Sequence, residues 1–248
     1  MVEEQGIKEN TLIILTADHA IEPGKSTCYE RGLKVPFIVS WPARIKEAGE
    51  TQEIVQFTDF LPSFAEIAGV TREFDEQIDG KSFLPVLLGE SIAEREYIYS
   101  EEGYTRAVTG EKYKYISMRF PDEVLENIKS GEAGIITHFG DEFQAHGLIA
   151  SKYHKGYFDA DQLYDLENDP WEQNNLAYDP VYSEILADLK NVLSGFTQSF
   201  EHPFPVEEND YMHWDQYQDL TNKTKKMGTD RIYWWKRELE YPPVSSDK

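Results

Sequence analysis

The sequence predicts an α/β fold in which a layered sheet domain is followed by a small antiparallel sheet with a packed helix. Two short apolar runs, at residues 11–17 and 35–42, are typical of strands buried on both faces of a parallel sheet. Polar and apolar residues alternate in short segments between residues 97 and 116, which indicates antiparallel strands. Apolar side chains at helical spacing between residues 183 and 196 indicate an amphipathic helix.

The first region, residues 1–94, contains both apolar strands and one further helix. The run Thr11–Ala17 is rich in β-branched residues, and the run Val35–Pro42 ends at a proline. A helix is expected near Thr58–Ala68, because its first residues can cap it, a proline fits its first turn and Gly69 follows its end. These elements define residues 1–94 as the first predicted domain.

The second region, residues 95–200, contains the alternating segments and the amphipathic helix. Its strands are expected at residues 97–99, 106–108, 113–116 and 162–166, with a hairpin turn at 109–111. The apolar stripe of the helix is assigned to core packing. Residues 119–161 form an insert within this region, and residues 201–248 form an aromatic-rich carboxyl-terminal extension with no clear period.

The net charge of -22 limits the partners of the chain. Such a field repels nucleic acid and anionic membranes, and a polyanionic substrate would need a local cluster of positive charge. No stretch approaches the roughly 20 consecutive apolar residues of a membrane span. The first residues do not resemble a signal peptide, and Cys28 is the only cysteine, so the compartment cannot be read from the sequence.

Potential metal ligands follow directly after the first strand. Asp18 and His19 would lie at the carboxyl end of that strand, where α/β sheets bind ligands, and a carboxylate and an imidazole both ligate divalent cations. Lys25 follows in a loop, and an ammonium beside a cation-bound anion suits sulfate or phosphate recognition. Taken alone, these residues are better explained by a turn cap, a surface histidine and a solvated lysine.

Three segments carry a family resemblance. They are Thr16-Ala17-Asp18-His19, Gly24-Lys25-Ser26-Thr27-Cys28-Tyr29-Glu30 and Val35-Pro36-Phe37-Ile38-Val39-Ser40-Trp41-Pro42. In this order they resemble the second signature region of type I sulfatases, which belong to the alkaline phosphatase superfamily. The resemblance continues through the helix near Thr58, Asp79–Pro85 and Leu163–Leu176. It implies the carboxyl-terminal part of a three-layer αβα, alkaline-phosphatase-like sheet domain, followed by a small antiparallel sheet with a packed helix.

The resemblance also implies a function and roles for particular residues. The activity would be hydrolysis of a sulfate ester, on a sulfated carbohydrate or an aryl sulfate. Asp18 and His19 match ligands of Ca²⁺, and Lys25 matches the lysine that contacts the sulfate during catalysis. The family nucleophile is a formylglycine made from the first residue of Cys-x-Pro-x-Arg or Ser-x-Pro-x-Arg. Three histidines of the insert, His138, His146 and His154, could contact the substrate from the rim, although loop histidines are more often solvated. His138 is the one we select as a substrate contact.

Departures from the family pattern qualify this expectation. Cys28 is followed by Tyr29-Glu30-Arg31, so it is not the nucleophile, and the early Asp-Asp metal ligands of the family have no counterpart. We therefore expect an amino-terminal half upstream, without which this chain is inactive. Ala20 and Arg31 replace glycines of the pattern, so the loop backbone is expected to differ. A phosphatase or phosphodiesterase of the same superfamily and a non-catalytic fragment or subunit remain as alternatives. Family members are often exported.

Overall fold

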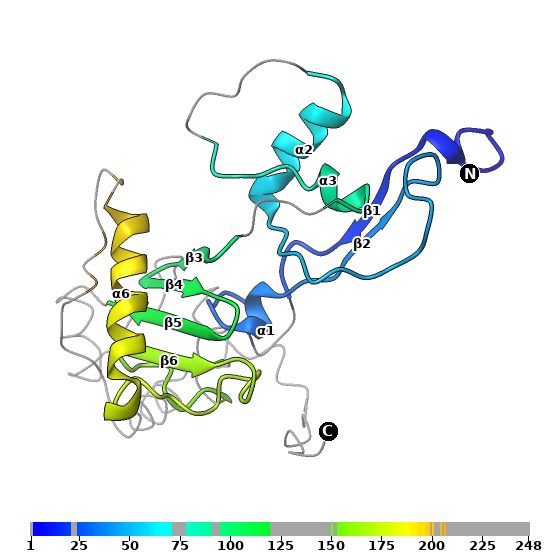
Figure 1. Ribbon diagram of the computed structural model, residues 1–248. Coiled ribbons are helices and arrows are strands. Elements are labelled where there is room, and N and C mark those ends of the chain that lie inside the picture. The colour runs from blue at the N-terminus through cyan, green and yellow to red at the C-terminus, as the bar shows by residue number, and fades with distance from the viewer. Residues whose placement is uncertain are drawn as a thin grey trace, which may run out of the picture. The chain divides into compact units, whose positions relative to one another are not determined.

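The computed structural model describes residues 2–20, 24–70, 78–90, 95–119 and 153–198, and the single residues 150, 200, 204 and 206. The chain divides into two compact units (Figure 1). The first unit comprises residues 1–18 and 35–96, and the second comprises residues 19–34 and 97–248. Residues 19–34 thus join the second unit, although they lie within the predicted first domain. Among the residues described, no helix combines the length and the apolarity needed to cross a membrane.

The first unit contains a two-stranded sheet. A short 3₁₀ helix, η1 (Lys8–Asn10), precedes β1 (Ile13–Thr16), which pairs with β2 (Phe37–Ser40). The two strands are antiparallel, so the prediction of parallel strands is wrong for this pair. Leu15 is 61% exposed and Ile38 60% exposed, so burial on both faces is also not observed within the described residues. An apolar run indicates a strand, but it does not specify which way the neighbouring strand runs.

A helical layer of the first unit packs on β2 through aromatic rings. It consists of η2 (Phe57–Asp59), α2 (Phe60–Ile67) and α3 (Leu84–Leu87), so the helix predicted near Thr58–Ala68 is confirmed. Phe83 is 1% exposed, and its ring centroid lies 5.4 Å from that of Phe37 and 5.6 Å from that of Phe60. Edge-to-face contacts at these distances stabilise the layer beyond the area they bury.

The start of α2 is fixed by the buried carboxylate of Asp59. It accepts hydrogen bonds from the backbone N–H groups of Gln56 and Lys81, both at 2.8 Å, and from two guanidinium nitrogens of Arg95 at 2.8 and 2.7 Å. A Cβ atom on Gly80 would lie 1.9 Å from the carbonyl oxygen of the residue before Asp59, so only glycine fits there. Burial favours a raised pKa for Asp59, but these hydrogen bonds outweigh it and hold the pKa below its usual value.

The second unit is built on a four-stranded antiparallel sheet. Its strands are β3 (Ile98–Glu102), β4 (Thr105–Thr109), β5 (Tyr113–Met118) and β6 (Asp161–Asp165), in the order β3-β4-β5-β6. These strands confirm the predicted small antiparallel sheet. The amphipathic helix is α6 (Ser183–Thr197), preceded by the 3₁₀ helix η3 (Pro180–Tyr182). The short helix α1 (Glu30–Leu33) belongs to the same unit.

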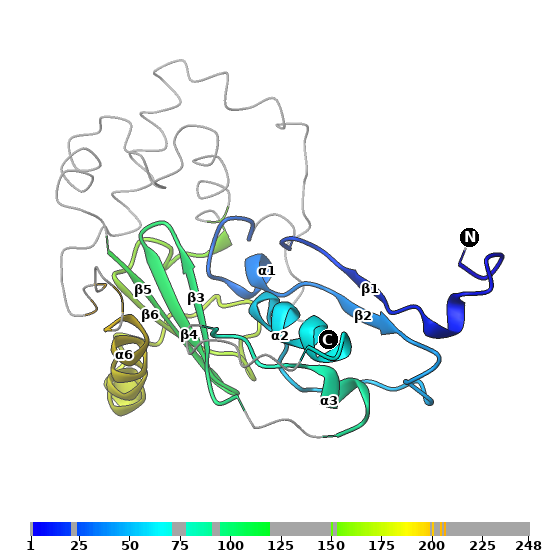
Figure 2. The ribbon, with the colours of Figure 1, turned by 90° about the horizontal axis from the view of Figure 1, so that it is seen from above.

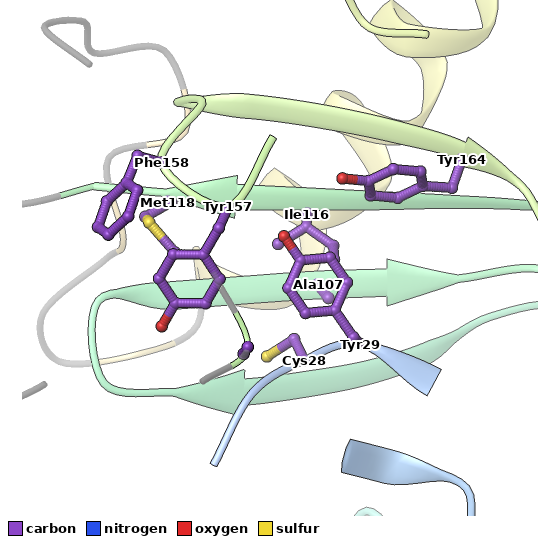
Figure 3. Packing of buried hydrophobic residues seen from close by; sticks show 9 residues of the cluster. Cys28, Tyr29, Ala107, Ile116, Met118, Tyr157, Phe158 and Tyr164 are labelled. Atoms are coloured by element: carbon purple, nitrogen blue, oxygen red, sulfur yellow. The ribbon is translucent and has the colours of Figure 1, made fainter. Parts of the chain in front are cut away.

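The two faces of this sheet are covered by different segments (Figure 2). Val108, Tyr115 and Leu163 lie side by side on neighbouring strands and pack against Leu189 and Leu193 of α6. Because side chains alternate along a strand, their neighbours point to the opposite face. That face is covered by residues 28 and 29 and by residues 157 and 158, which pack on β4, β5 and β6 (Figure 3).

Candidate functional site

The loop that carries Lys25 is closed by two glycines. We call residues 24–34 the Lys25 loop. A Cβ atom on Gly24 would lie 2.3 Å from the backbone carbon of Arg31, and one on Gly32 would lie 2.2 Å from the Gly24 carbonyl oxygen. The backbones at the two ends of the loop therefore touch, and neither glycine tolerates a side chain. The Ala20 N–H donates to the Gly32 carbonyl at 3.2 Å, which ties the preceding residues to the same closure.

Polar contacts fix the conformation inside the loop. The Thr27 hydroxyl donates to the Gly24 carbonyl at 2.6 Å and accepts from the Tyr29 N–H at 3.3 Å. Ser26, the residue after Lys25, has a φ of 58°, in the left-handed region that non-glycine residues seldom adopt. Such a conformation persists where surrounding contacts determine it. Lys25 is therefore held between a closed backbone and a constrained residue.

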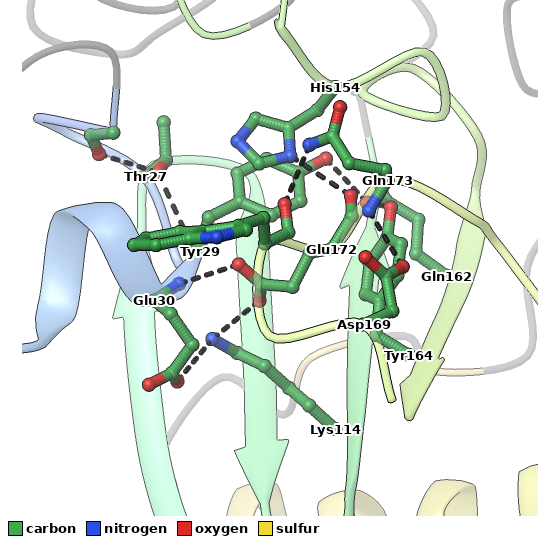
Figure 4. A network of polar contacts seen from close by, with 12 residues as sticks. Thr27, Tyr29, Glu30, Lys114, His154, Gln162, Tyr164, Asp169, Glu172 and Gln173 are labelled. Carbon is green, nitrogen blue, oxygen red and sulfur yellow. Dashed lines mark hydrogen bonds and ion pairs between the residues drawn. The ribbon is translucent and has the colours of Figure 1, made fainter. Parts of the chain in front are cut away.

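A buried ion network anchors the loop to the sheet (Figure 4). The Lys114 ammonium, on β5, lies 3.0 Å from Glu30 Oε1 and 2.9 Å from Glu172 Oε1, and the Lys114 and Glu172 side chains are fully buried. Glu172 Oε2 also accepts the Glu30 N–H at 2.7 Å. Burial favours a lowered pKa for Lys114, but Glu172 and Glu30 outweigh it and raise the pKa. The ammonium thus remains charged and joins the loop, β5 and residue 172.

Tyr29 forms a second anchor for the loop. Its ring stacks on the imidazole of His154, with centroids 3.6 Å apart and planes 4° apart, and its hydroxyl donates to Gln162 Oε1 at 2.6 Å. His154 is fully buried, so its predicted place on a solvated rim is wrong. His154 Nδ1 lies 3.1 Å from the Glu172 carbonyl oxygen and donates to it, since a carbonyl only accepts. Burial lowers the pKa of His154 to about 4, so the ring is neutral and structural at physiological pH.

Lys25 itself is half-buried. Among the described residues, no carboxylate or carbonyl pairs with its ammonium. Three described lysines of this unit are ion-paired: Lys112 with Glu167, Lys114 with Glu172 and Lys190 with Asp161. A half-buried ammonium at this position is able to bind an anion.

The two proposed metal ligands lie where the chain passes from one unit to the other. Asp18 is assigned to the first unit and His19 to the second, and both are exposed. His19 Nδ1 lies 2.6 Å from the Ala20 carbonyl oxygen. That contact requires a proton on Nδ1, so the neutral ring carries its lone pair on Nε2, as a metal-ligating histidine needs. Within the described residues, no group of three or more His, Cys, Asp or Glu side chains is arranged to hold a metal. His138 lies outside the described residues.

Cys28 is unsuited to nucleophilic chemistry. Its side chain is 1% exposed in the core under the Lys25 loop, and burial raises the pKa of its thiol to about 12. The thiolate, which is the reactive form, is therefore scarcely populated at neutral pH. A cavity of about 10 Å³, with room for one water molecule, lies between the loop and the sheet near this residue. This is consistent with the reading that Cys28 is not the nucleophile.

One segment matches the Ser-x-Pro-x-Arg letters of the family nucleophile, a match that the sequence reasoning did not weigh. It is Ser40-Trp41-Pro42-Ala43-Arg44. Ser40 ends β2 and pairs with Ile13, Trp41 is buried, and the Arg44 guanidinium lies 5.4 Å from the Trp41 ring centroid. Within the described residues, nothing hydrogen-bonds the Ser40 hydroxyl. These contacts give the segment the role of a strand end and turn, as the resemblance of Val35–Pro42 implies.

Two residues of the anchoring network were not identified from the sequence. Lys114 was read as a polar residue of an alternating strand, and Glu172 only as part of the Leu163–Leu176 resemblance. The signal that points to them is the motif glutamate five residues after Lys25. Glu30 lies beside a sheet with a fully buried lysine, and a buried charge requires a partner.

Comparisons with known proteins agree with this architecture. A family model described as N-sulphoglucosamine sulphohydrolase, C-terminal, matches residues 24–199. An ulvan-active sulfatase of Formosa agariphila is 38% identical over 193 residues, which is 74% of this chain and 36% of that protein. The solved structure of a 2-O GAG sulfatase is 25% identical, with a TM-score of 0.52, and the match covers 77% of this chain and 36% of that one.

A second solved structure extends the agreement in fold. It shows a protein in complex with its substrate D-glucosamine-2-N,6-O-disulfate, and it is 22% identical with a TM-score of 0.59 over 84% of this chain and 38% of that one. The chain spans about a third of the length of the relatives it matches. The neighbours have the predicted α/β fold of the alkaline phosphatase type. The chain therefore belongs to the sulfatase family and corresponds to its carboxyl-terminal portion.

Proposed function

We propose that this chain supplies the sulfate-recognition loop of an enzyme that hydrolyses sulfate esters of carbohydrates. The observation that carries the proposal is the unpaired, half-buried ammonium of Lys25 on a loop fixed by buried contacts. Family membership supports sulfate ester hydrolysis, and the 38% identical relative is an ulvan-active sulfatase. A carbohydrate sulfate is therefore the substrate class to test first, with aryl sulfates second.

The proposed role of Lys25 is to offset charge on the sulfate. A sulfate ester carries one negative charge, and more charge accumulates on its oxygens as sulfur is attacked. An ammonium held by a pre-formed loop stabilises that charge without having to reorganise at the moment of reaction. The half-buried position of Lys25 strengthens the interaction relative to a fully solvated lysine.

We further propose that Asp18 and His19 ligate Ca²⁺. Membership of the sulfatase family supports a metal cofactor in general, and the His19 tautomer fixed by Ala20 suits ligation through Nε2. A bound divalent cation would neutralise charge on the sulfate oxygens. Two ligands do not complete a calcium site, so further oxygen ligands are required. His138 is retained as a proposed substrate contact from its place in the sequence alone.

The nucleophile is proposed to come from outside these 248 residues, in an amino-terminal half of the sulfatase. The burial and raised pKa of Cys28 support this, as does the strand-end packing around Ser40. Under this proposal the chain binds a sulfated sugar but does not hydrolyse it. The non-catalytic alternative predicts the same absence of turnover, so the binding measurement is the informative one.

The experiment is a titration of the full chain, by calorimetry at low ionic strength, with N-acetylglucosamine 6-sulfate as the probe. Lys25→Ala is expected to weaken binding at least tenfold, since a charge-assisted hydrogen bond is worth about 1.5–3 kcal/mol. Lys34→Ala is the matched control, because Lys34 has the same charge in the same loop but is exposed. Equal affinities for the wild type and Lys25→Ala would contradict the proposal. Tighter binding of the corresponding phosphate ester would favour the phosphatase alternative.

A further inference from the structure

The cations of the second unit fall into two groups. Most described lysines and arginines pair with carboxylates: these are Arg106, Lys112, Lys114, Arg119 and Lys190. The others have no acidic partner among the described residues: these are Lys25, Arg31, Lys34 and Lys155. Three of these four lie within the Lys25 loop. In a chain with a net charge of -22, this loop is therefore a local concentration of uncompensated positive charge.

Arg31 lies over an aromatic ring, as Arg106 does over Phe204, but it lacks a described hydrogen-bond acceptor. Its guanidinium carbon lies 4.2 Å from the ring centroid of Trp171, which is 43% exposed. Arg106 and Arg119 each donate to backbone or carboxylate oxygens, whereas no described oxygen accepts from Arg31. Stacking on an indole orients the guanidinium plane and leaves its N–H donors available. The guanidinium of Arg31 is thus held in place, while its N–H groups have no acceptor among the described residues.

The backbone of Arg31 lies directly beside Gly24, the residue that precedes Lys25. A Cβ atom built on Gly24 would lie 2.5 Å from the Arg31 Cβ. The two unpaired cations therefore branch from adjoining backbone in one rigid loop. Two anionic groups on the same sugar, or on neighbouring sugars, are within the reach of such a pair of long side chains.

We propose that Arg31 and Trp171 form a second subsite, which binds an additional anionic group of the substrate beside the sulfate held by Lys25. That group is a carboxylate or a second sulfate, both of which match the planar fork of a guanidinium. The exposed part of the indole offers an apolar surface to the sugar ring. This inference rests on the proposed function of Lys25, and it narrows the substrate to a polyanionic carbohydrate. Arg31 also supplies local positive charge, which a polyanionic substrate needs because the net charge of the chain is negative.

The test uses the full chain and three probes in calorimetric titrations at low ionic strength. N-acetylglucosamine 6-sulfate carries one anionic group, glucosamine N,6-disulfate carries two sulfates, and a monosulfated disaccharide with glucuronate carries a sulfate and a carboxylate. The wild type is expected to bind at least one of the doubly charged probes about tenfold more tightly than the singly charged probe. The probe that shows this preference identifies the second group as a sulfate or a carboxylate.

The variants separate this inference from the proposed function. Arg31→Gln is expected to remove the preference and to leave binding of the singly charged probe unchanged, whereas Arg31→Lys restores part of it as a point charge. Trp171→Leu should weaken the preference, and Lys34→Ala should not change it. A wild type without any preference, or an Arg31→Gln variant that weakens all three probes equally, would overturn the subsite. If Lys25→Ala left the affinity for every probe unchanged, the proposed function would be overturned instead. The effect of Arg31→Gln on the doubly charged probes is measured separately from that outcome. Absence of binding to all probes would count against both.

Discussion

Replacing Lys114 by methionine is the strongest test of how the Lys25 loop is held. Methionine has a similar length, so the main change is loss of the charge that pairs with Glu30 at 3.0 Å and Glu172 at 2.9 Å. Glu172 would then be a fully buried carboxylate without a cation. Breaking a buried ion pair from one side costs about 3–5 kcal/mol, and the upper end is reduced if Glu172 takes up a proton. Burial already raises the pKa of Glu172, and Lys114 opposes this rise, so protonation in the variant is expected.

The assay is urea unfolding followed by circular dichroism, with Lys112→Met as the matched control. Lys112 lies two residues earlier in the chain, but it is 44% exposed and pairs with an exposed Glu167 at 2.9 Å. Because solvent screens such a pair, its loss is expected to change the unfolding midpoint little. The double variant Lys114→Met with Glu172→Gln should recover part of the loss, since no unpaired charge then remains buried. Equal destabilisation by Lys114→Met and Lys112→Met would refute the reasoning.

Three further predictions concern other parts of the chain. Because the pKa of Asp59 is held below its unfolded value, its contribution to stability is present above about pH 4 and is lost as the pH falls further; Asp59→Asn should flatten the melting temperature measured between pH 3 and 5. The pKa of His154 is lowered to about 4 in the folded chain, so the unfolded chain binds a proton first as the pH falls. Up to about 3 kcal/mol of the free energy of unfolding should therefore be lost between about pH 6.5 and 4. His154→Phe keeps the ring stacked on Tyr29 and should remove this loss. Mass spectrometry of the purified chain should find Ser40 and Cys28 unmodified, and the chain should not hydrolyse an aryl sulfate. An aldehyde at Ser40, together with turnover that Ser40→Ala abolishes, would refute the strand-end assignment.

The sequence predicted those helices and strands whose apolar residues repeat at regular spacing because one face packs against a core. The helix at 183–196 and the strands of the small sheet were confirmed because each has one face against a core within its own unit. Val108, Tyr115 and Leu163 illustrate this, since they pair across three neighbouring strands and all pack against α6. The segment Asp79–Pro85 was identified by the resemblance alone, and the structure shows why position 80 is glycine, since a Cβ atom there would lie 1.9 Å from the Thr58 carbonyl oxygen.

The sequence did not predict features that depend on long-range partners. The antiparallel pairing of β1 with β2 requires knowing which strand lies beside which, and an apolar run does not contain that information. Lys114 was expected to be an ordinary strand lysine, and its burial depends on Glu30 and Glu172, which are 84 and 58 residues away in the numbering. His154 was read as a loop histidine because its stacking partner, Tyr29, is just as remote. The resemblance located Lys25, but the network that fixes its loop became visible only in three dimensions.

The departures from the family glycines have unequal consequences. The loop backbone was expected to differ because Arg31 replaces the first of two glycines, yet Arg31 lies in the helix α1, where a side chain is tolerated. Gly32 is the residue that cannot change, since a Cβ atom there would meet the carbonyl oxygens of Gly24 at 2.2 Å and Thr27 at 2.6 Å. Closure of the loop therefore requires glycine at position 32 and leaves position 31 open to a side chain. Position 31 does not affect closure, adjoins Gly24 and carries a side chain that lies over the exposed indole of Trp171. If Lys25 binds sulfate as proposed, a change at position 31 can alter substrate preference without altering the loop.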